Sequence, residues 1–538
     1  MSKDRRLSAE SLLLLASEDI QDLSPNPELD PLLPTINEED DADFSILEVK
    51  NLFKIETSLL LNVFLAAFDG TVTASTYTII GSEFNAAHLG SWITTSYLIT
   101  STAFQPLYGT FSDVLGRRIC YFFATSIFAL GCVGCSFATD IYSLFLFRSL
   151  TGIGGGGLIT LSTVVNSDLI PISKRGLFQG FQNILIGVGS ILGASLGGVI
   201  SETVGWRFCF LIQVPVSLTG LIFGFLYLEN QKDIVSSKGV KDIDIQGSFL
   251  LIIGLTLQLL ALNTGSYLLF VASIIVLYIF VAIEFKTERI PIIPFKRIQG
   301  PSNYLVLFIS TLTGFANYGY IFILPLLFQI ALDDTPSKAG LRLGIPSLFT
   351  SVGALLTAFF MNRNVKNLNY LVHVGVLLLG IGNGLALFIS KSFPEYLLNF
   401  LLIPANCGLG MSNPALLFSF IFEFPKSMQA SSTSTLYLFR AIGQVWGVAT
   451  VSIIVQTVLK SFLVDNFAKD QPDLSPDVID GIIEKVTRSI SYINTLPTDI
   501  QRTVKASYEI SIRYAQVVST VICIVCFLLC LFRDFIKK

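Results

Sequence analysis

The sequence predicts an all-α polytopic membrane protein with about 14 transmembrane helices. Of its 538 residues, 52% are hydrophobic and only 14% are charged, whereas soluble domains carry roughly 25% charged residues. Apolar blocks of about 20 residues recur along the chain, the length that a helix needs to cross a bilayer. The loops between these blocks are alternately rich and poor in lysine and arginine, as expected for loops on opposite sides of a membrane.

The candidate spans follow the apolar blocks in order, and residues 263–266 join the seventh and eighth as a tight pair. The spans are 57–82, 90–111, 119–138, 142–166, 177–200, 206–228, 245–263, 267–285, 303–330, 339–361, 367–389, 394–421, 432–459 and 514–533. The basic loops include Arg117, Arg118, Lys174, Arg175, Lys232, Lys238, Lys286, Arg289, Lys296, Arg363 and Lys366. Their alternation with weakly charged loops places both termini in the cytosol and requires an even number of spans.

Two polar segments lie outside the spans. Residues 1–54 are acidic and lack the apolar core of a secretory signal near Met1, so we expect a disordered cytosolic tail. Within this tail, Glu28, Leu32 and Leu33 have the spacing of an acidic dileucine motif, which makes a sorting adaptor a candidate partner; a chance match is the alternative. Residues of about 460–513 form a long non-cytosolic loop, in which apolar residues at helical spacing predict short amphipathic helices.

Residue content argues against several functional classes. The net charge is −4, and no basic stripe could follow the phosphates of a nucleic acid. The chain has only two histidines, His88 and His373, and its eight cysteines lie in or beside apolar stretches. Two CxxC pairs lack the further ligands of a metal site. We therefore expect no enzymatic activity, no catalytic residue, no metal, no cofactor and no nucleic-acid partner.

Asp69 lies in the middle of the first span, where a carboxylate costs at least about 2.5–3.5 kcal/mol. Such a residue faces a cavity or a partner, and it often handles a proton or a cation. A purely structural Asp bonded to hydroxyls such as those of Thr71 or Thr73 is the alternative. Arg148, in the fourth span, also needs a partner, and Asp69 is one candidate. We expect Asp69 and Arg148 to serve proton coupling or substrate binding.

The loop after the second span reads GTFSDVLGRR and contains Gly109, Asp113, Gly116, Arg117 and Arg118. The glycines allow tight turning and close helix approach, and Asp113 can pair with the two arginines. Such a charge cluster can lock one conformation of a transporter and release the other. Charges that only set topology are the alternative. The sequence favours a cytosolic gate.

Two spans are rich in glycine. In the fifth span, Gly189, Gly193 and Gly197 recur every four residues, with Gly198 beside them, and this stripe lets two helix backbones approach closely. The stripe could serve helix packing alone, or it could serve packing at an interface that moves, and the sequence does not decide between these two roles. In the fourth span, the glycines from 152 to 157 spell GxGxxG, but they lie within a membrane span. A dinucleotide site would need a preceding strand and an opening helix, so that interpretation is rejected.

The later spans contain polar residues that are candidates for lining a cavity. They are Asn317, Tyr318, Tyr320, Gln329, Asn413 and Arg440. Prolines such as Pro325 and Pro414 interrupt the same helices, and the backbone groups freed by a proline can also line a cavity.

These motifs together resemble a known family. The segment from Gly109 to Arg118 resembles the signature between helices two and three of the major facilitator superfamily. The strings LAAFDGTVTAS and GVGSILGASLGG resemble its 14-helix drug:proton antiporter branch, although Ala194 replaces the usual proline of the fifth-helix motif. Arg148 matches a fourth-helix arginine that the family links to proton coupling. The strings TAFQPLYGTFSD, IQVPVS, IIPF, YLFRAIGQVWG and LPTDI resemble fungal vacuolar basic amino acid transporters.

The resemblance implies a fold of two six-helix halves, residues 55–230 and 301–538, with two additional helices and cytosolic linkers in residues 231–300. It also implies import of lysine, arginine and histidine into the vacuole in exchange for protons, with the proton and the cationic substrate competing for Asp69. A multidrug/proton antiporter, in the vacuolar or the plasma membrane, is the main alternative. A nutrient receptor that transports nothing is a further one.

Overall fold

The computed structural model describes residues 51–537, apart from short gaps. The gaps are 85, 87–88, 171, 229–243, 288, 297, 299, 335, 364–366, 425–427, 471–480, 483–484 and 487–489. The dileucine candidates Glu28, Leu32 and Leu33, with most of the predicted tail, therefore lie outside the described residues.

The described residues fold almost entirely into helices, each built on one of the apolar blocks. The helices are α3 (Leu52–Glu83), α4 (Gly90–Leu115), α5 (Arg117–Ser136), α6 (Ile141–Leu169), α7 (Ile172–Thr203), α8 (Arg207–Leu211), α9 (Gln213–Tyr227), α10 (Ile245–Thr264), α11 (Tyr267–Lys286), α12 (Pro301–Ala331), α13 (Pro336–Arg363), α14 (Asn367–Ala386), α15 (Glu395–Ile421), α16 (Gln429–Asp470), η5 (Ile490–Thr495) and α18 (Thr498–Lys537). Each predicted span corresponds to one of these helices, and the sixth corresponds to α8 and α9 together.

By length and composition, 13 helical segments of the described chain are apolar enough to cross a membrane. The predicted second span, α4, is not among them because serines, threonines and Asp113 lower its hydropathy. Its 26 residues nevertheless span about 39 Å at 1.5 Å per residue, enough to cross a bilayer. It packs against α6, α16 and α10, so its polar groups face protein rather than lipid. The prediction of an all-α polytopic protein is confirmed.

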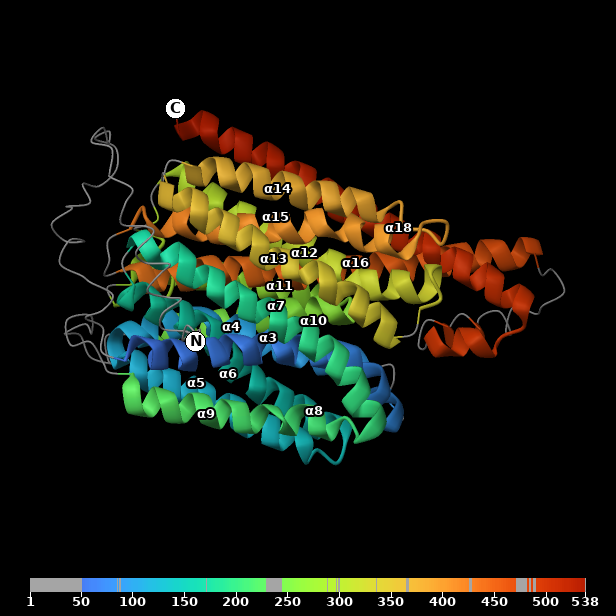
Figure 1. Ribbon diagram of the computed structural model, residues 1–538, viewed down its shortest axis with the longest axis horizontal. Coiled ribbons are helices and arrows are strands. Elements are labelled where there is room, and N and C mark those ends of the chain that lie inside the picture. The colour runs from blue at the N-terminus through green and yellow to red at the C-terminus, as the bar shows by residue number, and fades with distance from the viewer. Residues whose placement is uncertain are drawn as a thin grey trace, which may run out of the picture. The chain divides into compact units, whose positions relative to one another are not determined.

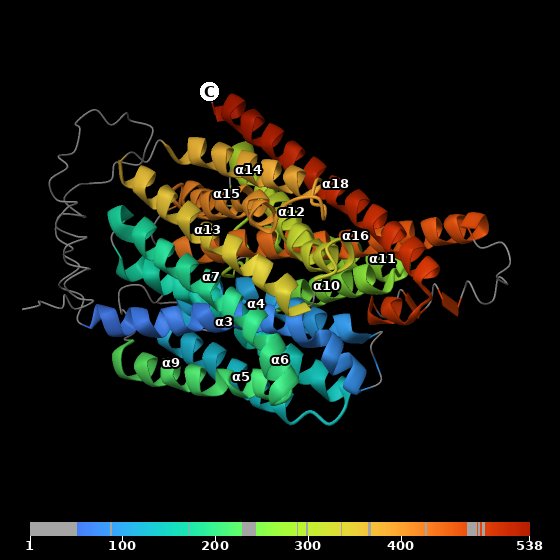
Figure 2. The same cartoon turned by 45° about the vertical axis from the view of Figure 1, so that its right-hand side comes forward.

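Two groups of helices and a central hairpin make up the bundle (Figures 1 and 2). Helices α3 to α9 form one group, here the N-terminal half, and α12 to α18 form the C-terminal half. The hairpin of α10 and α11 contacts α4 in the first half and α16 in the second. The halves meet mainly where α7 packs on α13 and where α4 packs on α16.

Successive helices run in opposite directions, so the bundle has two ends. One, the Arg117 end, contains the α4–α5 turn, the start of α3 and the end of α18. The opposite one, the Glu83 end, contains the end of α3 and the start of α18. At the Glu83 end two helices are longer than the predicted spans: α16 continues to Asp470, and α18 begins at Thr498. Much of the segment 460–513 is therefore an extension of two long helices.

Candidate functional site

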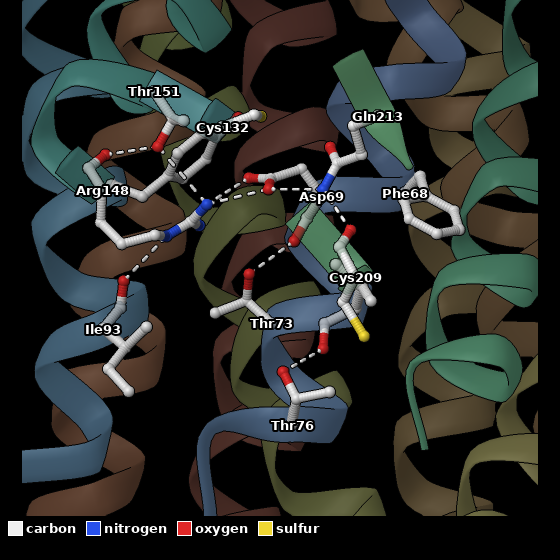
Figure 3. Close-up of polar contacts among 12 residues, drawn as sticks. Phe68, Asp69, Thr73, Thr76, Ile93, Cys132, Arg148, Thr151, Cys209 and Gln213 are labelled. Atoms are coloured by element: carbon white, nitrogen blue, oxygen red, sulfur yellow. Dashed lines mark hydrogen bonds and ion pairs between the residues drawn. The ribbon is translucent and has the colours of Figure 1, made fainter. Parts of the chain in front are cut away.

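A buried ion pair joins α3 and α6 in the N-terminal half. Arg148 Nη1 lies 2.8 Å from Asp69 Oδ1 and 2.9 Å from Oδ2, and both side chains are 0% exposed. Figure 3 shows the guanidinium facing the carboxylate directly. Two opposite charges at this depth are stable only together, because either one alone would lie uncompensated in a low-dielectric interior. The structure thus brings together the two residues that the sequence singled out.

Aromatic rings and uncharged polar groups complete the surroundings of this pair. Gln213 of α9 donates from Nε2 to Asp69 Oδ1 at 3.3 Å, and Arg148 Nε donates to the carbonyl of Ile93 at 3.2 Å (Figure 3). The Arg148 guanidinium lies 4.7 Å from the ring centroid of Tyr97 and 5.5 Å from that of Phe210, which favours the cation. Thr73 donates its hydroxyl to the backbone carbonyl of Asp69, not to the carboxylate. The carboxylate thus depends on Arg148 and Gln213.

The glycine stripe of α7 lies directly against the helix that carries Asp69. A Cβ atom at Gly193 would meet the Thr71 side chain and the Phe68 carbonyl, and one at Gly189 would meet the Phe64 carbonyl. Gly197 faces Ser75 and Val72 in the same way. Only glycine permits this approach of the two backbones. The backbone carbonyl of Gly198 accepts a hydrogen bond from the Ser201 hydroxyl.

A second charged network lies at the Arg117 end. Arg117 donates from Nη1 to Asp113 Oδ1 at 2.6 Å and from Nε to Asp168 Oδ2 at 2.7 Å. Its side chain is only 8% exposed, so it links α4, α5 and α6 beneath the surface. Gly116 has a φ of 92°, a left-handed conformation that favours glycine in the α4–α5 turn. Arg118 extends toward α9 and donates to the Phe225 carbonyl at 2.9 Å.

The two halves are in contact near this charged network. Gly109 lies so close to Ser434 of α16 that any larger residue would displace one helix. Thr163 and Tyr437 share a hydroxyl hydrogen bond of 3.1 Å across the seam, and Arg175 Nη1 donates to Gln429 Oε1 at 2.8 Å. Thr163 also lines a cavity of about 10 Å³ between α6, α7, α15 and α16, too small for an amino acid. The halves are therefore closed against each other at this point.

Comparison with known proteins identifies the family. The family model of the Major Facilitator Superfamily matches residues 59–448, which is most of the chain. The chain belongs to the Major Facilitator Superfamily. It is 50% identical over 507 residues to an uncharacterized transporter of Schizosaccharomyces pombe, covering 92% of this chain and 89% of the relative. It is 48% identical over 471 residues to the vacuolar basic amino acid transporter 2 of Saccharomyces cerevisiae, covering 84% of this chain and 98% of that protein.

A solved structure agrees with this assignment at the level of the fold. The human organic anion transporter MFSD10 (TETRAN) superposes with a TM-score of 0.60 at 14% sequence identity, covering 89% of this chain and 100% of that chain. At this identity the likeness speaks for the major facilitator fold alone.

The candidate cavity residues of this major facilitator lie in the C-terminal half, but they are not one cluster. Tyr318 lies in the middle of α12. Tyr320 is 2% exposed, and its hydroxyl has no partner among the described residues. Gln329 is near the end of α12, away from the others. Arg440 and Asn413 are neighbours, because Arg440 Nη2 lies 3.3 Å from the Asn413 carbonyl oxygen.

Sequence reasoning missed three residues that complete the two networks. Gln213 binds Asp69, Asp168 binds Arg117, and Tyr97 lies over Arg148. Gln213 is a polar residue within the sixth predicted span, which was a detectable signal, since a polar group at such a position needs a partner. Asp168 lies just beyond the fourth predicted span and gave a weaker signal. Tyr97 gave no such signal. In the described part of the chain, no group of three or more His, Cys, Asp or Glu residues is arranged to hold a metal ion.

Proposed function

We propose that this chain is a proton-coupled antiporter that moves basic amino acids into the vacuole of a fungal cell. The observation that carries the proposal is the fully buried Asp69–Arg148 pair in a major facilitator whose relative, at 48% identity, is named a vacuolar basic amino acid transporter. A transporter of this kind needs an ionisable group at depth, and Asp69 is that group.

Proton coupling follows from the geometry of the pair. A proton on Asp69 cancels the negative charge and leaves the Arg148 guanidinium without a counter-ion. Breaking a buried pair from one side costs about 3–5 kcal/mol, enough to change the balance between two arrangements of the halves by more than 100-fold. Loss of the proton restores the Asp69–Arg148 pair, and with it the arrangement of the halves that the intact pair favours. In this structure the Asp69 carboxylate is bonded to Arg148 and Gln213, and these are the contacts that a proton on Asp69 would weaken.

The network at the Arg117 end serves as the cytosolic gate in this proposal. The lysines and arginines of the alternate loops support a cytosolic position for this end, and the Glu83 end is lumenal in this proposal. The hydrogen bonds from Arg117 to Asp113 and Asp168, together with the Thr163–Tyr437 contact, hold the cytosolic ends of the helices together. Their release opens the path from the cytosol.

Uptake of labelled lysine by vacuolar vesicles tests the proposal. We expect vesicles with an acidic interior to accumulate lysine, and we expect an uncoupler to abolish the accumulation. Vesicles from cells that lack the chain are the control. Accumulation that survives the uncoupler, or absence of lysine uptake together with proton-driven export of toxic compounds, would contradict the proposal and favour a multidrug antiporter. Vesicles that move neither kind of compound would favour a receptor.

A further inference from the structure

Arg440, on α16 of the C-terminal half, is a partly buried arginine. Its guanidinium is in contact with α15, where Nη2 is 3.3 Å from the Asn413 carbonyl oxygen, and it lies 5.3 Å from the ring centroid of Tyr437. The backbone at Arg440 packs against Gly314 of α12 with no room for a side chain between them. Arg440 is therefore held in place by three helices.

Arg440 has a vacant hydrogen-bonding group and, in the part of the chain that the structure describes, no acidic partner. Its Nε is buried without a hydrogen-bond acceptor, and none of the ion pairs found among the described residues includes this guanidinium. A guanidinium at this depth is costly unless an anion compensates it. One backbone carbonyl and the face of one ring do not supply a negative charge. The arrangement therefore points to an anionic ligand.

Asn413 provides the complementary group beside the guanidinium. Its side-chain Oδ1 is buried and has no donor among the described residues. An unsatisfied acceptor on the residue whose backbone carbonyl contacts the guanidinium fits a ligand that carries a carboxylate and an ammonium on the same carbon atom. That is the common end of every α-amino acid.

We propose that Arg440 and Asn413 form the subsite for the α-carboxylate and the α-ammonium of the substrate. This inference rests on the proposed function, because it takes the substrate to be an amino acid. Arg440 donates to the carboxylate through its guanidinium, and Asn413 Oδ1 accepts from the ammonium. Arg148 is less suited to this task, since both carboxylate oxygens of Asp69 hold its Nη1 and neutralise its charge, and only its Nη2 lacks a partner among the described residues.

The subsite adjoins the seam between the halves. Tyr437, one turn before Arg440, lies against its guanidinium and also bonds Thr163 of the N-terminal half. A carboxylate that binds Arg440 therefore acts on a residue that helps to hold the halves together. Substrate binding and gate opening are coupled through this tyrosine.

Binding measurements with truncated ligands test the subsite. The probes are lysine, cadaverine, which is lysine without its carboxylate, and 6-aminohexanoate, which is lysine without its α-amino group. Apparent dissociation constants come from thermal-shift titration of the purified full-length chain. We expect wild type to bind lysine about 100-fold more tightly than cadaverine, as a site built for a polar group rejects a ligand that lacks it. Arg440→Gln should remove this preference by weakening lysine about 100-fold while leaving cadaverine unchanged.

Further variants separate recognition from folding. Arg440→Lys keeps a charge and should retain part of the preference, and Asn413→Ala should weaken lysine but not 6-aminohexanoate. Arg513→Gln, which removes an arginine at the Glu83 end of α18, should leave the lysine-to-cadaverine ratio as in wild type. An unchanged ratio in Arg440→Gln, or equal binding of both ligands by wild type, would overturn the subsite alone. A wild-type chain that binds and moves no lysine would instead overturn the proposed function.

Discussion

Two arginines lie deep in the bundle, one in each half, and their surroundings differ. Arg148 is completely buried and is neutralised by Asp69 through two short contacts. Arg440 is partly exposed and has a backbone carbonyl and an aromatic ring as its neighbours, but no acid among the described residues. The Arg148 guanidinium has an internal counter-ion whose charge a proton can cancel. The Arg440 guanidinium has no internal counter-ion among the described residues, and a ligand can supply one. In the proposed account one half serves the proton and the other serves the substrate.

Removing one member of the buried pair should have the largest effect on stability. Asp69→Asn leaves Arg148 uncompensated and should reduce the free energy of unfolding by about 3–5 kcal/mol. Thermal unfolding in detergent measures this. The double variant Asp69→Asn with Arg148→Gln removes both charges and should recover most of the loss. If the double variant is less stable than either single one, the pair is not the cause of the loss.

Disturbing the close packing of α7 on α3 should have the second-largest effect on stability. Gly193→Ala places a methyl group against Thr71 and the Phe68 carbonyl, and such overpacking costs typically about 1–3 kcal/mol. Gly384→Ala is the matched control in α14, because its Cβ would meet only a methyl group of Thr520 at 3.8 Å. The same unfolding assay should show Gly384→Ala to be neutral or slightly stabilising. Equal losses for the two variants would show that the glycine stripe has no special packing role.

Asp333 is an exposed acid, and its ion pairs should contribute much less to stability than the buried Asp69–Arg148 pair. Burial raises the pKa of Asp333, but hydrogen bonds from Lys391 and Lys505 outweigh it and lower the pKa overall. The stabilisation is therefore present above the ordinary carboxyl pKa and disappears as pH falls through the lowered value. Asp333→Asn should cost at most about 1 kcal/mol at neutral pH after solvent screening, and nothing in strong acid. A loss that persists in acid would exclude the ion pairs as its source.

Arg440→Gln should have the smallest effect on stability, in contrast to its effect on ligand binding. The substitution removes a charge that has no acid beside it, so the ligand-free chain should be equally or more stable. Arg148→Gln, assayed beside it, should destabilise strongly. Parallel thermal unfolding of the two variants without substrate measures the difference. Similar losses for both would mean that Arg440 has an acidic partner after all, and the contrast between the halves would fail.

The helices could be predicted from the sequence because bilayer thickness imposes a length on every apolar block. The special status of Asp69 and Arg148 was equally visible, since charge is rare at membrane depth. Their contact could be named only as one candidate pairing, because they are 79 residues apart and pairing depends on how α3 packs on α6. The full lengths of α16 and α18 could not be predicted from the apolar blocks either. Both helices extend past the predicted spans, because a helix can continue into water when its polar residues allow it.

The central claim is that Asp69 takes the proton that drives transport. The most direct test compares wild type and Asp69→Asn in proteoliposomes loaded with labelled lysine, with and without an imposed pH difference. The account predicts that wild type concentrates lysine on the acidic side, whereas Asp69→Asn exchanges lysine for lysine at most and does not respond to the pH difference. Concentration of lysine by Asp69→Asn to the level of wild type would contradict it.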